Sequence, residues 1–250
     1  MRAIIIGAGR GSRLMPTTEN APKCFAEIQG KRILDWTVEA LKGGGCTEIC
    51  FVGGYRIEAV RRDYPEFVFR TNRDWPDNNI LVSLMCAEDL MDRPFVTAYS
   101  DILFTPKLVA GLVQARDEIA LGVDTDWREH YRPRTRHPPH DAEKVITSGG
   151  RVERVHRGIP YDEATGEFIG VARFGSEGAR WLREFYHRRM AEFWDRPYRE
   201  AALFQKAYLI HLFQDMIEHG LAFGHVDTPG KYREIDTQED MDLAQTLWQP

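Results

Sequence analysis

The first half of the chain alternates short apolar runs with segments in which apolar residues repeat at helical spacing. Short runs rich in Ile, Val and Phe are typical of buried strands, whereas spacings of three and four residues are typical of helices. The predicted strands span 3–6, 48–52, 67–70, 95–99 and 119–123, and the predicted helices lie near 33–41, 81–90 and 108–113. This alternation predicts an α/β fold with a mostly parallel central sheet between two layers of helices. Ligands of such sheets bind at the carboxyl ends of the strands.

The pattern changes after Val123. Residues 127–140 are crowded with Arg, His and Pro, which predicts a loop. Two short runs separated by Ser148-Gly149-Gly150 then predict a β-hairpin, and one strand and three helices follow it. These elements are the hairpin strands 144–147 and 152–156, the strand 168–174 and the helices 178–194, 202–219 and 238–248. We therefore expect one domain over residues 1–250 with a small mixed β insertion.

Composition and charge exclude several classes of protein. Of the 250 residues, 43% are apolar, and the net charge is −5. A disordered chain has fewer apolar residues, and a generic nucleic-acid-binding domain is strongly basic. The chain starts directly on its first strand, without a signal peptide or an apolar run of about 18 residues. We expect a cytoplasmic protein that binds neither nucleic acid nor membrane, and the oligomeric state stays open. The cysteines, Cys24, Cys46, Cys50 and Cys86, lack zinc-site spacing, so we expect reduced, mostly buried thiols.

A glycine-rich segment follows the first strand. Its sequence is Gly7-Ala8-Gly9-Arg10-Gly11-Ser12-Arg13. Glycine lets backbone N–H groups approach an anion closely, which favours a phosphate-binding turn over a plain tight turn. The segment lacks the lysine of a Walker A loop. Ser12 also stands where a dinucleotide-binding loop has its third glycine, and the second predicted strand does not end in an acid.

The continuation of this loop carries a family resemblance. Arg13-Leu14-x-Pro16 and then Pro22-Lys23 follow the glycines. The whole segment resembles the signature of nucleotidyltransferases that join a nucleoside monophosphate to a sugar phosphate or a small phosphorylated alcohol. The resemblance implies their Rossmann-like, nucleotide-diphospho-sugar transferase-like fold. It also implies that the loop wraps the nucleotide, with Gly7, Ala8, Gly9, Arg10 and Gly11 in contact with it, while Arg13 and Lys23 neutralise the triphosphate.

Two aspartates are candidates for a metal site. Asp101 follows the predicted strand 95–99, and Asp236 precedes the last predicted helix, where it resembles the family's late acidic motif. A triphosphate needs a divalent cation, and Mg²⁺ prefers carboxylate oxygens. We expect Asp101 and Asp236 to hold Mg²⁺ and to form the catalytic set with Lys23 and Arg13. The alternatives are a turn residue at Asp101 and a helix N-cap at Asp236.

The middle of the chain resembles one branch of this family. Asn78-Asn79 and Ser83-Leu84 look like the element that reads the base in phosphocholine cytidylyltransferases. Asn78, Asn79, Ser83 and the nearby Tyr99 are therefore predicted to bind the nucleotide, here CTP. Helix capping is the alternative role for the two asparagines.

Further segments resemble the same branch, and the acceptor-binding residues are predicted from them. The resemblance assigns Asp124, Trp127, Lys144, Glu167 and Glu234 to this role. Lys144 would hold the acceptor phosphate, although Val145 replaces the proline that sugar-phosphate relatives have next. Aromatic side chains together with an acid could hold a quaternary ammonium by cation–π attraction. Primary amines, phosphonates and amino-acid phosphates remain open as acceptors, and so does a packing role for the aromatic residues.

The resulting functional hypothesis is a Mg²⁺-dependent cytidylyltransferase that acts on a phosphocholine-like or aminoalkylphosphonate-like compound. One alternative is a sugar-1-phosphate nucleotidyltransferase that uses UTP, dTTP or GTP, and another is an inactive nucleotide-binding regulator. The nucleotide-binding part would span about 1–125, the acceptor-binding insertion about 126–175, and the C-terminal helices with the metal motif about 176–250. Residues 134–140, without apolar anchors, are expected to be disordered until a ligand binds, as a lid or as a solvated basic loop.

Overall fold

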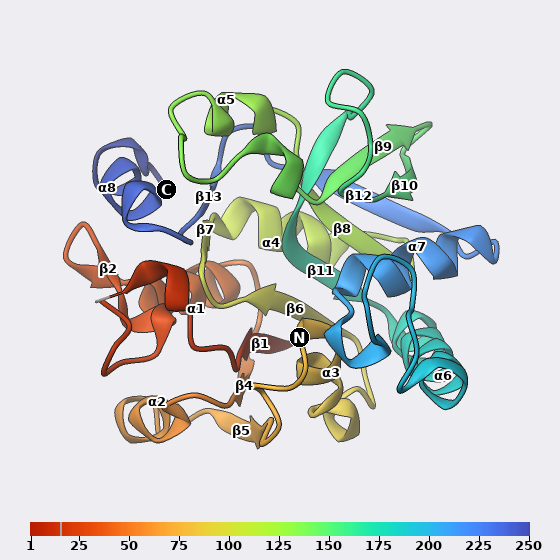
Figure 1. The fold of residues 1–250 in the computed structure, drawn as a ribbon, viewed down its shortest axis with the longest axis horizontal. Coiled ribbons are helices and arrows are strands. Elements are labelled where there is room, and N and C mark those ends of the chain that lie inside the picture. The colour runs from red at the N-terminus through yellow and green to blue at the C-terminus, as the bar shows by residue number, and fades with distance from the viewer. Residues whose placement is uncertain (16) are drawn as a thin grey trace.

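The structure, a computed structural model, describes residues 1–15 and 17–250, so Pro16 of the nucleotidyltransferase-like signature lies outside the described residues. A nine-stranded sheet forms its centre (Figure 1). In spatial order its strands are β5 (Val68–Thr71), β4 (Glu48–Gly53), β1 (Arg2–Gly7), β6 (Phe95–Tyr99), β11 (Gly166–Phe174), β8 (Ile119–Asp124), β12 (Phe223–Asp227), β10 (Arg151–Val155) and β9 (Lys144–Ser148). All eight strands expected from the sequence are present, and β12 is added to them.

Strand direction divides the sheet into two parts. From β5 to β6 all neighbours run parallel, and β8 and β12 are also parallel to each other. Strand β11 runs antiparallel between β6 and β8, and the hairpin β9–β10 pairs antiparallel at the edge. The α/β class with a mixed insertion is confirmed, and the parallel pairing is concentrated in the N-terminal half.

Helices cover both faces of the sheet, because alternate strand residues point to opposite sides. Ala3 and Ile5 of β1 contribute to a core with α1 (Ile33–Gly43), α2 (Ile57–Asp63) and α4 (Pro106–Gln114). Ile4 and Ile6 contribute to the other core, with α3 (Ile80–Met85), α6 (Ser176–Phe193) and α7 (Leu209–Glu218). The apolar alternation of the sequence therefore produces a three-layer sandwich, and α6 and α7 lie together at one side of it in Figure 1.

Two small sheets connect the ends of the chain to the carboxyl edge of the main sheet. They pair β2 (Glu27–Ile28) with β3 (Lys31–Arg32) and β7 (Ile102–Phe104) with β13 (Tyr232–Glu234). The last helix, α8 (Gln238–Leu247), packs beside β2, as Figure 1 shows. Gln245 accepts a hydrogen bond from the backbone N–H of Gln29 at 2.6 Å and donates one to the carbonyl of Glu27 at 2.8 Å. This arrangement brings the residues around position 236 next to the N-terminal loop.

Some predicted elements differ from the observed ones. The predicted loop 127–140 contains α5 (Trp127–Tyr131), which forms because Trp127 and Tyr131 lie one turn apart and bury the same face. The helix predicted from 202 begins only at Leu209, after a 3₁₀ turn and an extended step at Ala207. Short 3₁₀ turns occupy Ser12–Leu14, Lys23–Phe25, Glu88–Leu90, Pro139–Asp141 and Phe204–Lys206.

Other features agree with the sequence. All four cysteines are free, and three of them are buried. Within the described ranges, no helix combines the length and the apolar character that a membrane crossing requires.

Candidate active site

A cavity of about 550 Å³ opens where β1 and β6 end. Its wall combines the glycine loop, the start of α3, the segment 137–143, the start of β11 and the end of β13. It lies at the carboxyl edge of the parallel half of the sheet, as expected for this architecture. Fourteen of the predicted site residues line it: Gly7, Ala8, Gly9, Gly11, Arg13, Lys23, Asn78, Asn79, Ser83, Tyr99, Asp101, Glu167, Glu234 and Asp236.

The glycine loop needs glycine for two different reasons. A Cβ on Gly7 would come within 2.6 Å of the Phe51 ring, and Gly11 has a φ of +67° and packs against the side chain of Lys23. Among residues 1–15 and 17–250, a Cβ on Gly9 would meet nothing within 4 Å beyond its chain neighbours. Packing therefore requires Gly7 and Gly11, whereas Gly9 leaves bare backbone facing open space, as a close approach by a phosphate needs.

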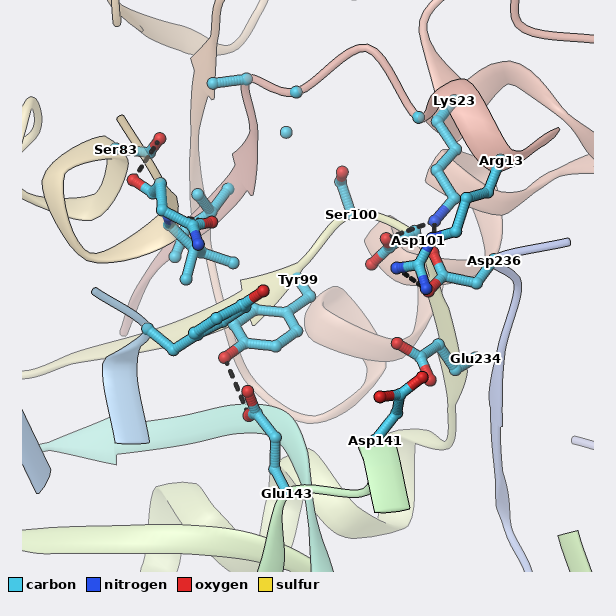
Figure 2. A pocket seen from close by; sticks show the side chains of 18 of the residues that line it. Arg13, Lys23, Ser83, Tyr99, Ser100, Asp101, Asp141, Glu143, Glu234 and Asp236 are labelled. Carbon is cyan, nitrogen blue, oxygen red and sulfur yellow. Dashed lines mark hydrogen bonds and ion pairs between the residues drawn. The ribbon is translucent and has the colours of Figure 1, made fainter. Parts of the chain in front are cut away.

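Lys23 joins the two predicted metal aspartates. Its Nζ donates to Asp101 Oδ2 at 2.7 Å and also to Asp236 Oδ1, while Arg13 pairs with the other oxygen of Asp236. Figure 2 shows all four side chains converging on one side of the cavity. Burial alone would lower the pKa of Lys23, but the two carboxylates outweigh burial and raise it. The same pairing holds the pKa of Asp236 below its ordinary value, although burial acts in the opposite direction.

Backbone pairing places these aspartates together. Strand β13 pairs antiparallel with β7, so that Glu234 lies opposite Ile102. The N–H of Ile235 donates to the carbonyl of Asp101 at 2.9 Å. Two acids that are 135 positions apart in the chain (236 − 101) therefore share one cation cluster.

A second group of titratable residues lies beside this cluster. His137 Nε2 is 3.5 Å from Glu234 Oε2, and its Nδ1 is 3.7 Å from Asp240 Oδ2. His137, Glu234 and Asp236 each offer a ligand atom, all within 4.8 Å of one another. Burial and the charge of Asp236 raise the pKa of Glu234 to about 7. No spacing rule connects His137 to the two acids, so the sequence alone does not point to this histidine.

The segment 132–141 is anchored rather than free. Arg134 donates to the carbonyl of Glu234 at 2.8 Å and forms an ion pair with the buried Asp240 at 2.8 Å. The N–H of Thr135 donates to Glu239 Oε2 at 2.8 Å. This corrects the expected disorder of residues 134–140: polar anchors on α8 replace the apolar anchors that the segment lacks.

The predicted base-reading residues Asn78, Asn79 and Ser83 form hydrogen bonds within the protein. Asn78 exchanges hydrogen bonds of 2.6 and 3.0 Å with Asn72, which also donates to Ser83 at 2.9 Å. Asn79 caps α3 through the N–H of Ile80 at 2.8 Å and donates to the carbonyl of Lys206 at 3.0 Å. The capping alternative therefore describes Asn79, although both asparagines still line the cavity.

The far side of the cavity from Lys23 carries further charged groups. Tyr99 donates through its hydroxyl to Glu143 at 3.2 Å, and Arg157 donates to the other oxygen of Glu143 at 3.2 Å. The Arg157 guanidinium lies 4.0 Å from the centre of the Tyr208 ring. The family resemblance assigned Lys144 to the acceptor, but in the structure its neighbour Glu143 lines the cavity instead. Figure 2 shows Tyr99 and Glu143 apart from the Lys23 cluster.

Four predicted site residues do not line the cavity. Asp124 is fully buried and accepts hydrogen bonds from the N–H groups of Asp126 and Gly230, while Trp127 is fully buried against Tyr131. These contacts correct the expectation that Asp124 and Trp127 contact the acceptor. Lys144 donates to the carbonyl of Pro139 at 3.3 Å, and Arg10 lies exposed, 5.6 Å from the Tyr55 ring centre.

Comparisons with known proteins agree with this geometry. Residues 3–194 match the MobA-like NTP transferase domain family. The CTP:phosphoglutamine cytidylyltransferase of Campylobacter jejuni is 32% identical over 254 aligned positions, which cover 97% of this chain and 98% of that protein. The choline-phosphate cytidylyltransferase of Streptococcus pneumoniae is 32% identical over 108 residues, which cover 42% of this chain and 46% of that protein.

Solved structures share the fold. The inositol-1-phosphate CTP transferase of T. maritima superposes with a TM-score of 0.74 at 20% identity and covers all of this chain and 98% of its own. The CTP:phosphocholine cytidylyltransferase of Streptococcus pneumoniae gives a TM-score of 0.72 at 20% identity, with 98% of this chain and 97% of its own covered.

Proposed function

The chain belongs to the MobA-like NTP transferase domain family and is a nucleotidyltransferase, and from this premise we propose that it transfers CMP from CTP to a small phosphorylated or phosphonylated compound and releases pyrophosphate. One observation carries the proposal: a single cavity joins the glycine loop, the Lys23 cluster and the acidic start of β11. The glycine loop and the Lys23 cluster suit the phosphates, and the acidic surface beside them suits a cationic group on the acceptor, so both substrates can be held side by side. The cytidylyltransferase that matches almost the whole chain supports CTP as the donor.

Mg²⁺ is part of the proposal. Asp101 and Asp236 supply hard oxygen ligands on the cavity wall, which fits the preference of Mg²⁺. Their only basic partners in the described structure are Lys23 and Arg13, which are the side chains proposed to bind the triphosphate. When bound, Mg²⁺ would neutralise phosphate charge and polarise the α-phosphate. We propose that Lys23 and Arg13 then turn from the carboxylates toward the phosphates.

The chain's own residues contribute orientation and charge. Backbone N–H groups at Gly9 and its neighbours bind phosphate oxygens, and Lys23 stabilises the charge that develops as pyrophosphate leaves. The acceptor oxygen is already anionic, so the reaction needs no strong base and no covalent enzyme intermediate. Asn78 and Ser83 at the start of α3 provide the polar edge for the base.

The identity of the acceptor is the open part of this function. The full-length relative acts on phosphoglutamine by its name, and shorter matches are named for phosphocholine and 2-aminoethylphosphonate. These compounds share a phosphoryl or phosphonyl group and a cationic nitrogen at neutral pH. We propose an acceptor of this shape, in a reaction that takes place in the cytoplasm.

A pyrophosphate-release screen tests the function. CTP, UTP, dTTP and GTP are each combined with Mg²⁺ and with phosphoglutamine, phosphocholine, 2-aminoethylphosphonate or glucose 1-phosphate. We expect release that depends on the acceptor and is fastest with CTP. Release only with sugar 1-phosphates would support the sugar-nucleotide alternative, and no release with any pair would support the inactive regulator. The same screen without Mg²⁺ tests the proposed metal.

A further inference from the structure

The acids that line the cavity differ in one respect: all but one have a basic partner. Glu167 lies within 4 Å of no basic nitrogen in residues 1–15 and 17–250, and only a tyrosine hydroxyl bonds to it. The paired acids and their partners are Asp101 with Lys23, Asp236 with Lys23 and Arg13, Glu143 with Arg157, Glu234 with His137, and Asp141 with His140. Glu167 is therefore the acid of the cavity wall that is left to pair with a positive charge on a ligand.

The geometry of Glu167 fits that role. The side chain sits near the start of β11, is 3% exposed and lines the cavity. Its Oε1 accepts a hydrogen bond from the hydroxyl of Tyr131 at 2.7 Å, whereas Oε2 is buried and has no hydrogen-bond partner among the described residues. Lys144 lies opposite Glu167 in the strand register but directs its ammonium to the carbonyl of Pro139. An unpartnered buried carboxylate oxygen is costly, and a ligand N–H would remove that cost.

The aromatic pair Trp127–Tyr161 offers no free face to a quaternary ammonium. Trp127 and Tyr161 pack together with ring centres 5.0 Å apart. The guanidinium of Arg128 already lies 5.0 Å from each ring, so the chain's own cation occupies this aromatic pair. A trimethylated nitrogen also has no N–H to donate to Glu167 Oε2, whereas a primary ammonium has three.

We propose that Glu167 binds a primary ammonium group of the acceptor, so that the enzyme uses phosphorylated or phosphonylated primary amines in preference to their trimethylated or uncharged counterparts. This inference rests on the proposed function and adds the class of acceptor to it. Tyr131 is a positioning residue, because its hydroxyl fixes the carboxylate of Glu167 from the side away from the ligand.

Matched acceptors test the proposal by calorimetric binding with the α,β-methylene analogue of CTP and Mg²⁺ present. Phosphoethanolamine and phosphocholine differ only in three N-methyl groups, and ethyl phosphate lacks the nitrogen. Phosphoglutamine and its Nα-acetyl derivative form a second pair. We expect the primary amine of a pair to bind about 10–100-fold more tightly to the wild-type protein, the range for a hydrogen bond to a charged group. Glu167→Gln should abolish this preference, and Tyr131→Phe should reduce it.

Glu163→Gln is the control variant, because Glu163 is an exposed acid just before β11. It should leave the preference unchanged. Equal binding within both pairs, no measurable binding of either amine, or a preference that survives Glu167→Gln would overturn the proposal. Pyrophosphate release distinguishes failure of the Glu167 proposal from failure of the proposed function. Transfer from CTP without an ammonium preference contradicts only the Glu167 site. An ammonium preference in binding without any transfer contradicts only the proposed function.

Discussion

The two ends of the cavity are built in different ways. The phosphate end comes mostly from one continuous stretch, residues 7–23, in which bare glycine backbone is followed by Arg13 and Lys23. The acceptor end combines Glu143, Arg157, Glu167 and Glu234, which lie on separate strands and turns and meet only in the folded protein. A binding site for an invariant group such as a triphosphate can be local in sequence. In the proposed function, selectivity for a variable acceptor would be distributed over the C-terminal half.

The largest expected effect is at the phosphate end. Lys23→Ala removes a buried cation that touches both Asp101 and Asp236, and we expect turnover to fall about 10²–10³-fold, as for the loss of one group that stabilises a transition state. Steady-state pyrophosphate release measures it. Lys31→Ala, at an exposed ion pair with Glu39, is the matched control and should be neutral. Near-normal turnover in Lys23→Ala would show that the phosphate end of the cavity does not contribute to catalysis through Lys23.

The next effect concerns the segment that connects the two ends. Arg134→Ala removes the closer ion-pair partner of Asp240, whose side chain is fully shielded, and leaves His137, at 3.7 Å, beside it. We expect a loss of about 3–5 kcal/mol in the free energy of unfolding. Asp240 also accepts hydrogen bonds from the N–H groups of Asp236 and Thr237, so Mg²⁺ affinity should weaken as well. Denaturant unfolding and Mg²⁺ titration measure the two effects.

The control for this segment is Arg132→Ala. Arg132 is 74% exposed, and its one ion-pair partner in the part of the chain that the structure describes is Glu129, so its removal should change the free energy of unfolding by less than about 0.5 kcal/mol. Equal stability losses in the two variants would show that the segment is not anchored through Arg134.

A smaller effect should appear in the pH dependence at the acceptor end. Burial, and then the charge of Glu234, raise the pKa of Glu167 to about 8. Below that pH the free carboxyl is protonated and must lose its proton to pair with an ammonium. The KM for a primary-amine acceptor should therefore fall about tenfold between about pH 7 and about pH 9.

The charged and titratable neighbours of Glu167 set the control for that experiment. They are Glu234 on β13, Tyr131 on α5, Arg134 on the anchored segment, Asp124 on β8 and Lys144 on β9. Glu167→Gln removes the titrating carboxyl and keeps all of these neighbours, so it should flatten the dependence of KM on pH. If the slope persists in Glu167→Gln, another of these groups, Glu234 first, controls the profile.

The smallest effect separates a capping role from base recognition. Asn79→Ala removes the N-cap of α3 and should lower the free energy of unfolding by about 1 kcal/mol. Because both polar ends of this side chain bond within the protein, the preference for CTP over UTP should stay within about twofold. Asn79→Ser restores a capping hydroxyl and should recover most of the stability. A large loss of CTP preference would assign Asn79 to the base.

Local patterns predicted one end of the site better than the other. The strands, the glycine loop and Asp101 follow from apolar runs, turn chemistry and a strand end, whereas Lys23 and Asp236 came from the family resemblance. These residues meet because strand ends share one edge of the sheet. His137, Glu143 and Arg157 could not be found that way. Their positions depend on the anchoring of the segment 132–141 and on pairing between β9, β10 and β11, which no short-range pattern encodes.

The same reason explains the incorrect acceptor residues. Trp127 and Asp124 carry the right chemistry for binding a cation, but α5 turns Trp127 into a small core, and the backbone of Gly230 and Asp126 takes up Asp124. Residue type alone does not distinguish a ligand-binding acid from one that caps a loop. The presence or absence of a partner in the folded protein does.

The most direct test of the account is the product formed from CTP, Mg²⁺ and a phosphorylated primary amine, followed by ³¹P NMR and mass spectrometry. The account predicts a new phosphoanhydride that joins CMP to the acceptor, in step with pyrophosphate, and little product from the trimethylated acceptor. Pyrophosphate release without an acceptor adduct, or an adduct formed only with sugar 1-phosphates, would contradict it.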